Sequence, residues 1–441
     1  MILRARPPVV ILGAGIAGLT AARELHRRGI VVKLFEAGKQ VAGLAASHRD
    51  EEGFVTDYGA HYITNRLAAS LGVSDRCDVV RHYGETVFFQ GRTYSFPFGL
   101  LRSPRYTMSA AVARLRARAR PPESAAEWYQ SAYGTALASD IAIPLVEAWA
   151  GADARDLAAS VIPPQAERGA LHVAGLKLAS RLSARAVANG YSRDLPETPH
   201  VWHVYPSGGV GMLCDHLAAD LDGVIQLESP VEQILVDNGR AVGVRVRGTV
   251  HEASAVVSTA PVHVLPKLVV GSEALRPLAR FRFRPMTLLN LRLNGQRLLP
   301  DVVTWVPERH MPFFRLTETT WSMPGLAPQG KTIISVDFGC ETSDPIWSMT
   351  ADHVAELALE HLEAIIPGVR RRYVGARVMR TPVAYPLFLR EYEADRVAFQ
   401  RAMPIEGLYS VGRNGEFAHI LMEDIYWRTR RRMRELAASL M

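Results

Sequence analysis

Residues 9–36 read VVILGAGIAGLTAARELHRRGIVVKLFE, and this stretch decides the fold. The apolar, β-branched residues 9–12 predict a buried strand, and residues 19–28 carry apolar side chains at helical spacing. Gly29 ends that helix, and residues 30–36 predict a second strand. The order of strand, glycine-rich turn, helix and strand is that of a βαβ unit.

Three glycines occupy the turn between the first strand and the helix, at positions 13, 15 and 18. In a dinucleotide-binding unit the first permits the tight turn, the second lets the backbone approach a pyrophosphate, and the third lets helix and strand pack closely. The N-terminus of the helix stabilises the phosphate charge. Glu36 ends the second strand 23 positions after Gly13 and would accept hydrogen bonds from the ribose hydroxyls. The stretch therefore predicts a bound dinucleotide, which either NAD or FAD would satisfy.

Motifs along most of the remaining chain favour FAD by resemblance. Residues 36–47 resemble the segment after the second strand in FAD enzymes of the amine oxidase, protoporphyrinogen oxidase and UDP-galactopyranose mutase group. Ala42 replaces the first glycine of that group's Gly-Gly-Leu and is expected to alter the turn slightly, whereas Gly43 remains for contact with the FAD phosphates or ribityl chain. Further motifs of the group match residues 53–61, which would pass beside the isoalloxazine, and residues 205–211, 255–261, 407–417 and 422–425.

The C-terminal motif is the most specific of these signals. Residues 408–411 predict a short buried strand, Gly412 opens a turn that a pyrophosphate can approach, and Arg413 offers a forked donor for it. A helix predicted from Ile420 onward would direct its N-terminal amides at the pyrimidine end of the flavin, where negative charge gathers on reduction. A turn followed by a basic amphipathic helix would explain Gly412 but not the nucleotide motifs at both ends of the chain.

The resemblance implies FAD as the cofactor and assigns its contacts residue by residue, with Val231 beside the adenine. The implied FAD-binding residues are Gly13, Ala14, Gly15, Ile16, Ala17, Gly18, Glu36, Ala37, Gly43, Leu44, Gly59, Ala60, His61, Val231, Thr259, Gly412, Arg413, Met422, Glu423 and Ile425.

The fold class implied is α/β: a Rossmann-type, glutathione-reductase-like FAD-binding domain assembled from discontinuous segments, together with a mixed α+β substrate domain. The FAD-binding domain is expected over residues 1–65, 200–285 and 405–441, and the substrate domain over 66–199 and 286–404. Within the substrate domain, periodicity predicts helices over 109–118, 124–139, 141–150 and 165–189, and strands over 287–293, 304–306 and 332–338, followed by a helix capped near Thr350.

Four residues are expected to act on the substrate. His61 would lie over the flavin as a proton shuttle or as a partner of N5, and the alternative is a loop histidine bonded to backbone. Arg315 and Tyr385 match mutase motifs, and Arg282 falls near a family arginine that binds a substrate diphosphate. Glu147, however, stands where the mutases have a basic residue before a tryptophan, which counts against a nucleotide-sugar substrate.

The composition excludes several other classes of protein. With 48% hydrophobic and 22% charged residues the chain is globular, and its net charge of +7 is dispersed, without a nucleic-acid-binding motif. No apolar run is long enough for stable membrane insertion, although the arginine-rich region 100–120 leaves a peripheral membrane contact open. Three widely spaced cysteines fit a reducing cytoplasm, and no histidine spacing indicates a metal site.

The leading prediction is an FAD-dependent oxidase or dehydrogenase that takes a hydride equivalent from a small-molecule substrate. A monooxygenase is less favoured because no second glycine-rich motif follows a strand to bind NAD(P)H. The alternatives are a redox-neutral sugar mutase that resembles UDP-galactopyranose mutase, and an FAD-binding protein without catalytic activity. The oligomeric state stays open.

Overall fold

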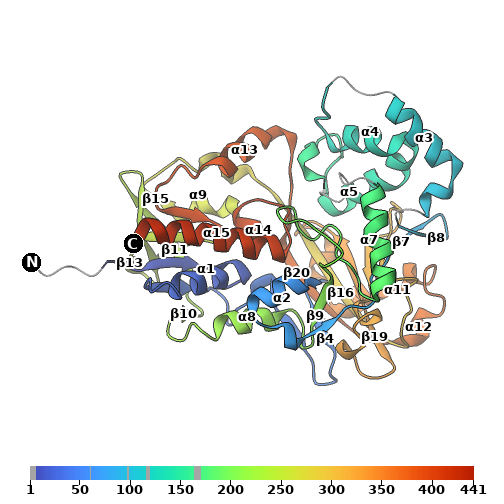
Figure 1. The fold of residues 1–441 in the computed structure, drawn as a ribbon, viewed down its shortest axis with the longest axis horizontal. Helices are drawn as coiled ribbons and strands as arrows, with labels where there is room; N and C mark the ends of the chain where they lie inside the picture. The colour runs from blue at the N-terminus through green and yellow to red at the C-terminus, as the bar shows by residue number, and fades with distance from the viewer. Residues whose placement is uncertain (1–5, 60, 97–98, 116–119, 163–169) are drawn as a thin grey trace, which may run out of the picture.

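The structure is a computed structural model that describes residues 6–59, 61–96, 99–115, 120–162 and 170–441 (Figure 1). Its centre is a five-stranded sheet in which every neighbouring pair of strands is parallel. Three distant stretches of sequence supply the strands, which confirms that the nucleotide-binding fold is discontinuous. In sheet order they are β10 (Ile225–Gln226), β2 (Val32–Phe35), β1 (Val9–Leu12), β14 (Ala255–Ser258) and β21 (Leu408–Ser410).

Both faces of this sheet are buried, as the continuous apolar runs of its strands require. Val9 and Ile11 face one core, which contains α1 (Ile16–His26), α8 (Gly211–Ala218) and α15 (Met422–Leu440), and α1 packs directly on α15. Val10 and Leu12 face the opposite core, which is closed by a four-stranded sheet. Its strands are β13 (Thr249–Glu252), β12 (Arg240–Val246), β11 (Val231–Asp237) and β15 (Val269–Val270).

A second large sheet of seven strands stands beside the first, and helix α11 (Ala351–Leu362) covers one of its faces. The hydroxyl of Thr350 accepts a hydrogen bond from the amide of His353 at 3.4 Å, which confirms the predicted helix cap. In sheet order the strands are β20 (Tyr373–Pro386), β16 (Phe283–Asn294), β19 (Lys331–Gly339), β18 (Arg315–Thr317), β17 (Val303–Trp305), β7 (Glu85–Phe89) and β8 (Arg92–Ser95).

A helical layer occupies the end of the molecule away from the N-terminus (Figure 1). It contains α3 (Pro104–Leu115), α4 (Ala125–Leu137) and α5 (Ile143–Ala150), and a π-helical turn over residues 138–142 joins α4 to α5. Helix α7 (Ala170–Ser183) runs between this layer and the seven-stranded sheet (Figure 1).

Several predicted element boundaries are wrong by a few residues. The helix predicted over 165–189 ends at Ser183 because Ala184 adopts a left-handed conformation with φ 51°. The helix predicted from Ile420 begins at Met422, and the strand predicted from residue 287 begins at Phe283. Residues 116–118 of the helix predicted over 109–118 lie outside the described residues. Within the described ranges, no helix is both long and apolar enough to span a membrane.

Candidate functional site

The carboxyl ends of the parallel strands meet at one edge of the five-stranded sheet. The amide of Gly13 donates to the carbonyl of Phe35 at 2.8 Å, and the amide of Thr259 donates to the carbonyl of Leu12 at 3.0 Å. The amide of Val411 donates to the carbonyl of Ser258 at 2.9 Å, so the C-terminal motif joins the same edge. Ligands of open α/β sheets bind outside this edge, at the point where the strand order reverses.

Protein packing explains two of the three glycines of the first turn. Gly13 has φ 93°, which only glycine adopts readily, and a Cβ there would overlap the hydroxyl of Thr259. A Cβ on Gly18 would overlap the carbonyl oxygen of Gly13. Gly13 therefore serves the tight turn beside Thr259, and Gly18 serves the close packing of helix α1 against that turn.

Gly15 differs because nothing in the protein requires a glycine there. Its φ is −72°, and a Cβ would lie 3.9 Å from its nearest neighbour, the carbonyl oxygen of Ala42. Gly15 also caps helix α1 without a side chain, and the first turn of that helix carries no acidic residue. The positive end of α1 and the open space over Gly15 together fit a phosphate group, which needs free amides and a close backbone approach.

The carboxylate of Glu36 is held beside this turn. It accepts hydrogen bonds from the amide of Ala14 at 2.6 Å and from the amide of Gly38 at 2.7 Å. The carbonyl of Glu36 accepts from the amide of Ser229 at 2.8 Å, which brings the start of β11 at Val231 to the same place. A carboxylate offers about four acceptor positions, so Glu36 retains room for ribose hydroxyls.

The turn after β2 carries alanine where the family motif has glycine. Ala42 has φ 87°, and its amide donates to the carbonyl of Ala14 at 2.8 Å. Gly43 follows with φ 52°, and a Cβ there would lie 3.7 Å from the Cα of Gly15. Ala37 is exposed and Leu44 half-buried in this connection. Ala42 therefore holds a left-handed conformation, which costs an L-residue roughly 1–2 kcal/mol.

The C-terminal motif closes the cradle from the other side. Gly412 has φ 85°, and a Cβ there would lie 2.8 Å from the Cβ of Ala17 in α1. Helix α15 then begins at Met422, with Ile425 buried in its first turn. The side chain of Glu423 is already engaged, because it accepts from the hydroxyl of Thr64 at 2.9 Å and from Nε of Arg66 at 2.8 Å. Both of these bonds use Oε1, whereas Oε2 of Glu423 is buried and has no hydrogen-bond partner among the described residues.

Three of the four predicted substrate-side residues come together, with Arg413, where the two large sheets meet. Arg315 on β18 donates from Nε to Asp337 at 2.6 Å, and Tyr385 lies at the end of β20. The guanidinium carbon of Arg413 lies 4.8 Å from the centroid of the Tyr385 ring. Arg413 therefore extends toward the seven-stranded sheet, a position that favours contact with the flavin ring or substrate over the pyrophosphate contact expected from sequence.

His61 lies in the same charged surroundings. Its Nε2 is 2.8 Å from the carbonyl oxygen of Tyr58, a geometry in which a neutral ring donates from Nε2 and leaves Nδ1 as a proton acceptor. Burial lowers the pKa of His61, and the charges of Arg413 and Arg315 lower it further, against the opposing charge of Asp57. The backbone contact that the alternative foresees is present, and the charges of Arg413, Arg315 and Asp57 also act on the ring. Ala60, predicted to touch the flavin, lies outside the described residues.

Two aromatic side chains complete this cluster. The ring of Trp149, from α5, lies 5.2 Å from that of Tyr385, and the ring of His419 lies 5.3 Å from Trp149 and 5.6 Å from Tyr385. Burial, with the charges of nearby arginines, lowers the pKa of His419 well below its ordinary value. Sequence reasoning missed His419. The sequence signal that could have found it is its position between the Gly-Arg and Met-Glu motifs, two segments that the resemblance assigns to the cofactor.

Arg282 is not brought into the cluster. Its side chain is 55% exposed and lies 4.0 Å from Glu341, which also pairs with Arg284. Glu147, the departure from the mutase pattern, accepts from Nη2 of Arg309 at 2.6 Å, so its charge is compensated within the protein.

Arg413 carries the clearest unsatisfied polar groups of the cluster. Its Nε and Nη2 are buried and have no hydrogen-bond partner among the described residues. Burial lowers the pKa of Arg413, and the charge of Arg315 adds to this effect. Two guanidinium groups therefore share the site with two engaged carboxylates: Asp337 pairs with Arg315, and Asp57 accepts from the hydroxyls of Tyr205 and Ser47. Such a site favours a ligand that brings hydrogen-bond acceptors or negative charge, as a flavin and an anionic substrate both do.

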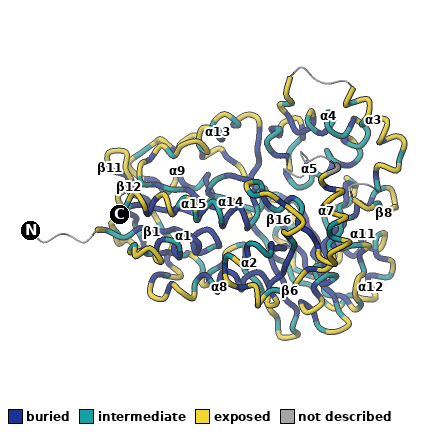
Figure 2. The backbone as a smooth tube through the Cα atoms, in the orientation of Figure 1, coloured by how far each residue is buried: buried dark blue, intermediate teal, exposed yellow. Residues whose placement is uncertain are grey.

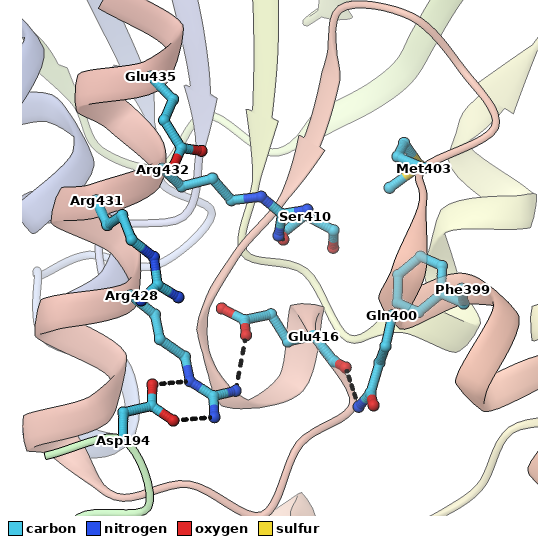
Figure 3. Close-up of a pocket in the computed structure, with 10 residues that line it drawn as sticks. All are labelled: Asp194, Phe399, Gln400, Met403, Ser410, Glu416, Arg428, Arg431, Arg432 and Glu435. Atoms are coloured by element: carbon cyan, nitrogen blue, oxygen red, sulfur yellow. Dashed lines mark hydrogen bonds and ion pairs between the residues drawn. The ribbon is translucent and has the colours of Figure 1, made fainter.

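A cavity of about 350 Å³ lies behind the C-terminal motif, against the polar face of α15 (Figure 3). Its polar groups largely satisfy one another: Arg428 pairs with Asp194 and Glu416, and Gln400 donates to the carbonyl of Glu416 at 3.2 Å. None of the clustered residues His61, Tyr385 or Arg413 lines it. We therefore do not assign the substrate to this cavity. Among the described residues, no group of three or more histidine, cysteine or acidic side chains is arranged to hold a metal ion.

Comparison with known proteins decides the family. The model of the flavin-containing amine oxidoreductases matches residues 16–424, most of the chain. The chain belongs to this family. The cofactor of this flavin-containing amine oxidoreductase is thus a flavin, and the cradle built by Gly15, Glu36 and Gly412 fits FAD, the form that carries a pyrophosphate and an adenosine ribose.

Individual relatives match over short stretches or at low identity. The L-amino-acid oxidase of Siganus canaliculatus is 37% identical over 97 residues, which are 20% of this chain and 18% of that protein. The chain spans less than a fifth of the length of the curated relatives that it matches. Reduced UDP-galactopyranose mutase superimposes with a TM-score of 0.80 at 18% identity, over 98% of this chain and 96% of that one. Cyclohexylamine oxidase from Brevibacterium oxydans gives 0.72 at 16% identity, over 99% and 100%. These structures share the fold of this amine oxidoreductase.

Proposed function

We propose that this protein is an FAD-dependent oxidoreductase that removes a hydride equivalent from a small-molecule substrate bound against Tyr385, Trp149 and His61. The proposal rests on the position of these residues, which lie together with Arg315 and Arg413 next to a dinucleotide cradle. In that cradle, the space over Gly15 fits a ligand and is not required by packing within the protein. Membership in the flavin-containing amine oxidoreductases supports it. When bound, FAD supplies the two-electron acceptor, and the protein supplies binding, orientation and electrostatics.

The residues of the cluster take different parts in this proposal. Trp149 and Tyr385 form an aromatic wall that orients the substrate and excludes water. His61 holds its Nδ1 ready to accept a proton from the substrate, because its lowered pKa keeps the ring neutral at pH 7. Arg315, fixed by Asp337, sets the positive potential of the site without moving.

The electrostatics of the site also restrict the substrate. A protonated amine would enter against two guanidinium groups, and the carboxylates that oppose their charge, Asp337 and Asp57, are already engaged within the protein. An acidic group on the substrate would instead satisfy the unpaired nitrogens of Arg413. We infer that the substrate carries a carboxylate or a comparable anionic group and is oxidised at a neutral C–N, C–O or C–C bond.

A redox-neutral sugar mutase is the second candidate. The neighbouring positions of Arg315 and Tyr385, which match mutase motifs, favour it. Against it, Glu147 carries negative charge where a mutase has a basic residue, and Arg282 is turned away from the cluster.

We place the enzyme in the reducing cytoplasm, on the ground that Cys77, Cys214 and Cys340 are all free thiols. The division into an FAD-binding domain and a substrate domain at the predicted boundaries is likewise part of the proposal. Strand β16 of the seven-stranded sheet begins at Phe283 and so crosses the predicted boundary at residue 285.

An anaerobic spectroscopic screen separates these functions. Candidate acidic amines, hydroxy acids and sugar nucleotides are mixed with the oxidised holoenzyme in the absence of oxygen. The proposal predicts that at least one acidic reductant bleaches the flavin and that oxygen restores the colour. A mutase would instead leave the oxidised flavin unchanged and would turn over a sugar nucleotide only after chemical reduction, with no acceptor consumed. Bleaching by neutral amines but not by their acidic analogues would contradict the anionic substrate while leaving the oxidoreductase intact.

A further inference from the structure

Helix α3 presents an apolar stripe to solvent. The side chains of Met108, Val112 and Leu115 are 68%, 44% and 86% exposed. Their spacing of four and three residues places them on one face of the helix, one above the other. Figure 2 shows exposed positions along α3, which lies at the outer edge of the helical layer. Large apolar residues exposed in a row indicate an interaction surface more often than isolated ones do.

The opposite face of α3 is firmly attached to the protein. Tyr106 is its only buried residue, and the Tyr106 hydroxyl donates to Asp140 at 3.1 Å. The amide of Ala136 donates to the hydroxyl of Ser109 at 3.0 Å. Gly134 allows this close approach, because a Cβ there would overlap the backbone of Ser109. The stripe is therefore a fixed surface and not the side of a loose helix.

Positive charge borders the stripe on both sides. Arg105 and Arg114 are exposed and, with 100° of rotation per residue, lie on either flank of the line from Met108 to Leu115. Residues 101–120 contain six arginines and no acidic residue. Arg105 pairs with Asp140 at 2.7 Å and Arg120 pairs with Glu123, so two charges of the segment are compensated. An apolar stripe between cationic flanks is the pattern of a helix that lies in the interface of an anionic membrane.

We propose that α3 docks this protein peripherally on an anionic lipid surface, with Met108, Val112 and Leu115 entering the acyl boundary. Each arginine near such a surface contributes roughly 1 kcal/mol of attraction. The stripe covers only about 10 Å of helix, which is too small for the roughly 800 Å² per partner of a stable protein interface. Because α3 packs on α4, and α5 carries Trp149 into the cluster, docking would hold the substrate-side end of the molecule at the lipid surface.

Vesicle co-sedimentation of the full-length holoenzyme tests this proposal. We expect binding to vesicles that contain phosphatidylglycerol, weak binding to pure phosphatidylcholine, and a marked decrease in high salt. The double variant Met108→Gln/Leu115→Gln should bind the anionic vesicles at least roughly ten-fold more weakly, because the apolar transfer energy is lost while every charge remains.

The matched control is Leu178→Gln/Leu182→Gln in α7, whose side chains are 57% and 80% exposed on another helix. The control should bind vesicles like the wild type, and both variants should retain flavin content and melting temperature. Equal binding by the α3 variant and the wild type, or absence of binding to anionic vesicles, would overturn the proposal. It would also be overturned by a dimer in analytical ultracentrifugation that the α3 variant dissociates, since the stripe would then be a contact between copies of this chain.

Discussion

The two large sheets contribute to the site in different ways. At the edge of the five-stranded sheet, the cofactor cradle is made mainly of backbone, namely the glycines at 13, 15 and 412 and the uncapped start of α1. One fixed carboxylate, that of Glu36, completes it. At the seven-stranded sheet, the substrate side is made of side chains that come from α5, β18, β20 and the loop before α15. Cofactor binding therefore depends on the lack of a side chain at a few glycine positions, whereas substrate chemistry depends on packing between segments that are distant in the sequence.

The sharpest test of this difference lies within the cradle. Gly15→Val should lower the FAD content of the purified protein below about a tenth of the wild type, because the branched side chain enters the space over the helix N-terminus. The melting temperature of the flavin-free form should stay unchanged, since no protein atom opposes a Cβ there. Gly18→Ala is the matched variant and should lower the melting temperature of the protein, because its Cβ overlaps the Gly13 carbonyl. Normal FAD content in Gly15→Val would refute the assignment of the cradle.

On the substrate side, the largest effect is expected at the Arg315–Asp337 pair. Arg315→Met leaves the Asp337 carboxylate, which is 1% exposed, without its partner and should destabilise the protein by about 3–5 kcal/mol. Urea unfolding of the flavin-free protein measures this. The double variant Arg315→Met/Asp337→Leu should recover most of the loss, because no unpaired carboxylate then remains at this position. A single variant as stable as the wild type would mean that Asp337 finds another partner.

His61 should affect the reaction and not the cofactor. His61→Gln should keep its FAD but slow anaerobic flavin reduction by about 10²-fold, the usual range for a lost general base. The lowered pKa of His61 means that its neutral form prevails at pH 7, so the wild-type rate should fall only as pH drops below about 6.5. This acidic limb should be missing in the variant. A limb that persists in His61→Gln would transfer the proton-accepting role to His419.

The smallest effect is expected at Ala42, where the family motif has glycine. Ala42→Gly should stabilise the folded protein by about 0.5–1 kcal/mol, because relief of the left-handed strain at φ 87° exceeds the extra freedom of glycine in the unfolded chain. Thermal or urea unfolding would show it, with exposed Ala37→Gly as a control that should not stabilise. A destabilised Ala42→Gly would mean that the turn holds its shape without strain.

The same division explains how much could be predicted from the sequence. The parallel sheet, the turn at Gly13 and the acid at Glu36 follow from local patterns, because glycine spacing and apolar runs dictate backbone shape. The approach of Trp149 and His419 to Tyr385 could not be derived, since it depends on how helix α5 and the segment before α15 pack across 270 residues of intervening chain. Arg282 shows the reverse error: its position next to a family motif suggested the site, but its side chain points to Glu341 and solvent.

The visible absorption spectrum of the purified protein, repeated on the supernatant after acid precipitation, shows whether the protein binds FAD. We expect the spectrum of oxidised flavin in the native protein and its release into the supernatant as FAD, because the described cradle holds the cofactor through amides and a carboxylate. Colour retained in the pellet would add a covalent link. A colourless protein that also fails to take up added FAD would contradict the account.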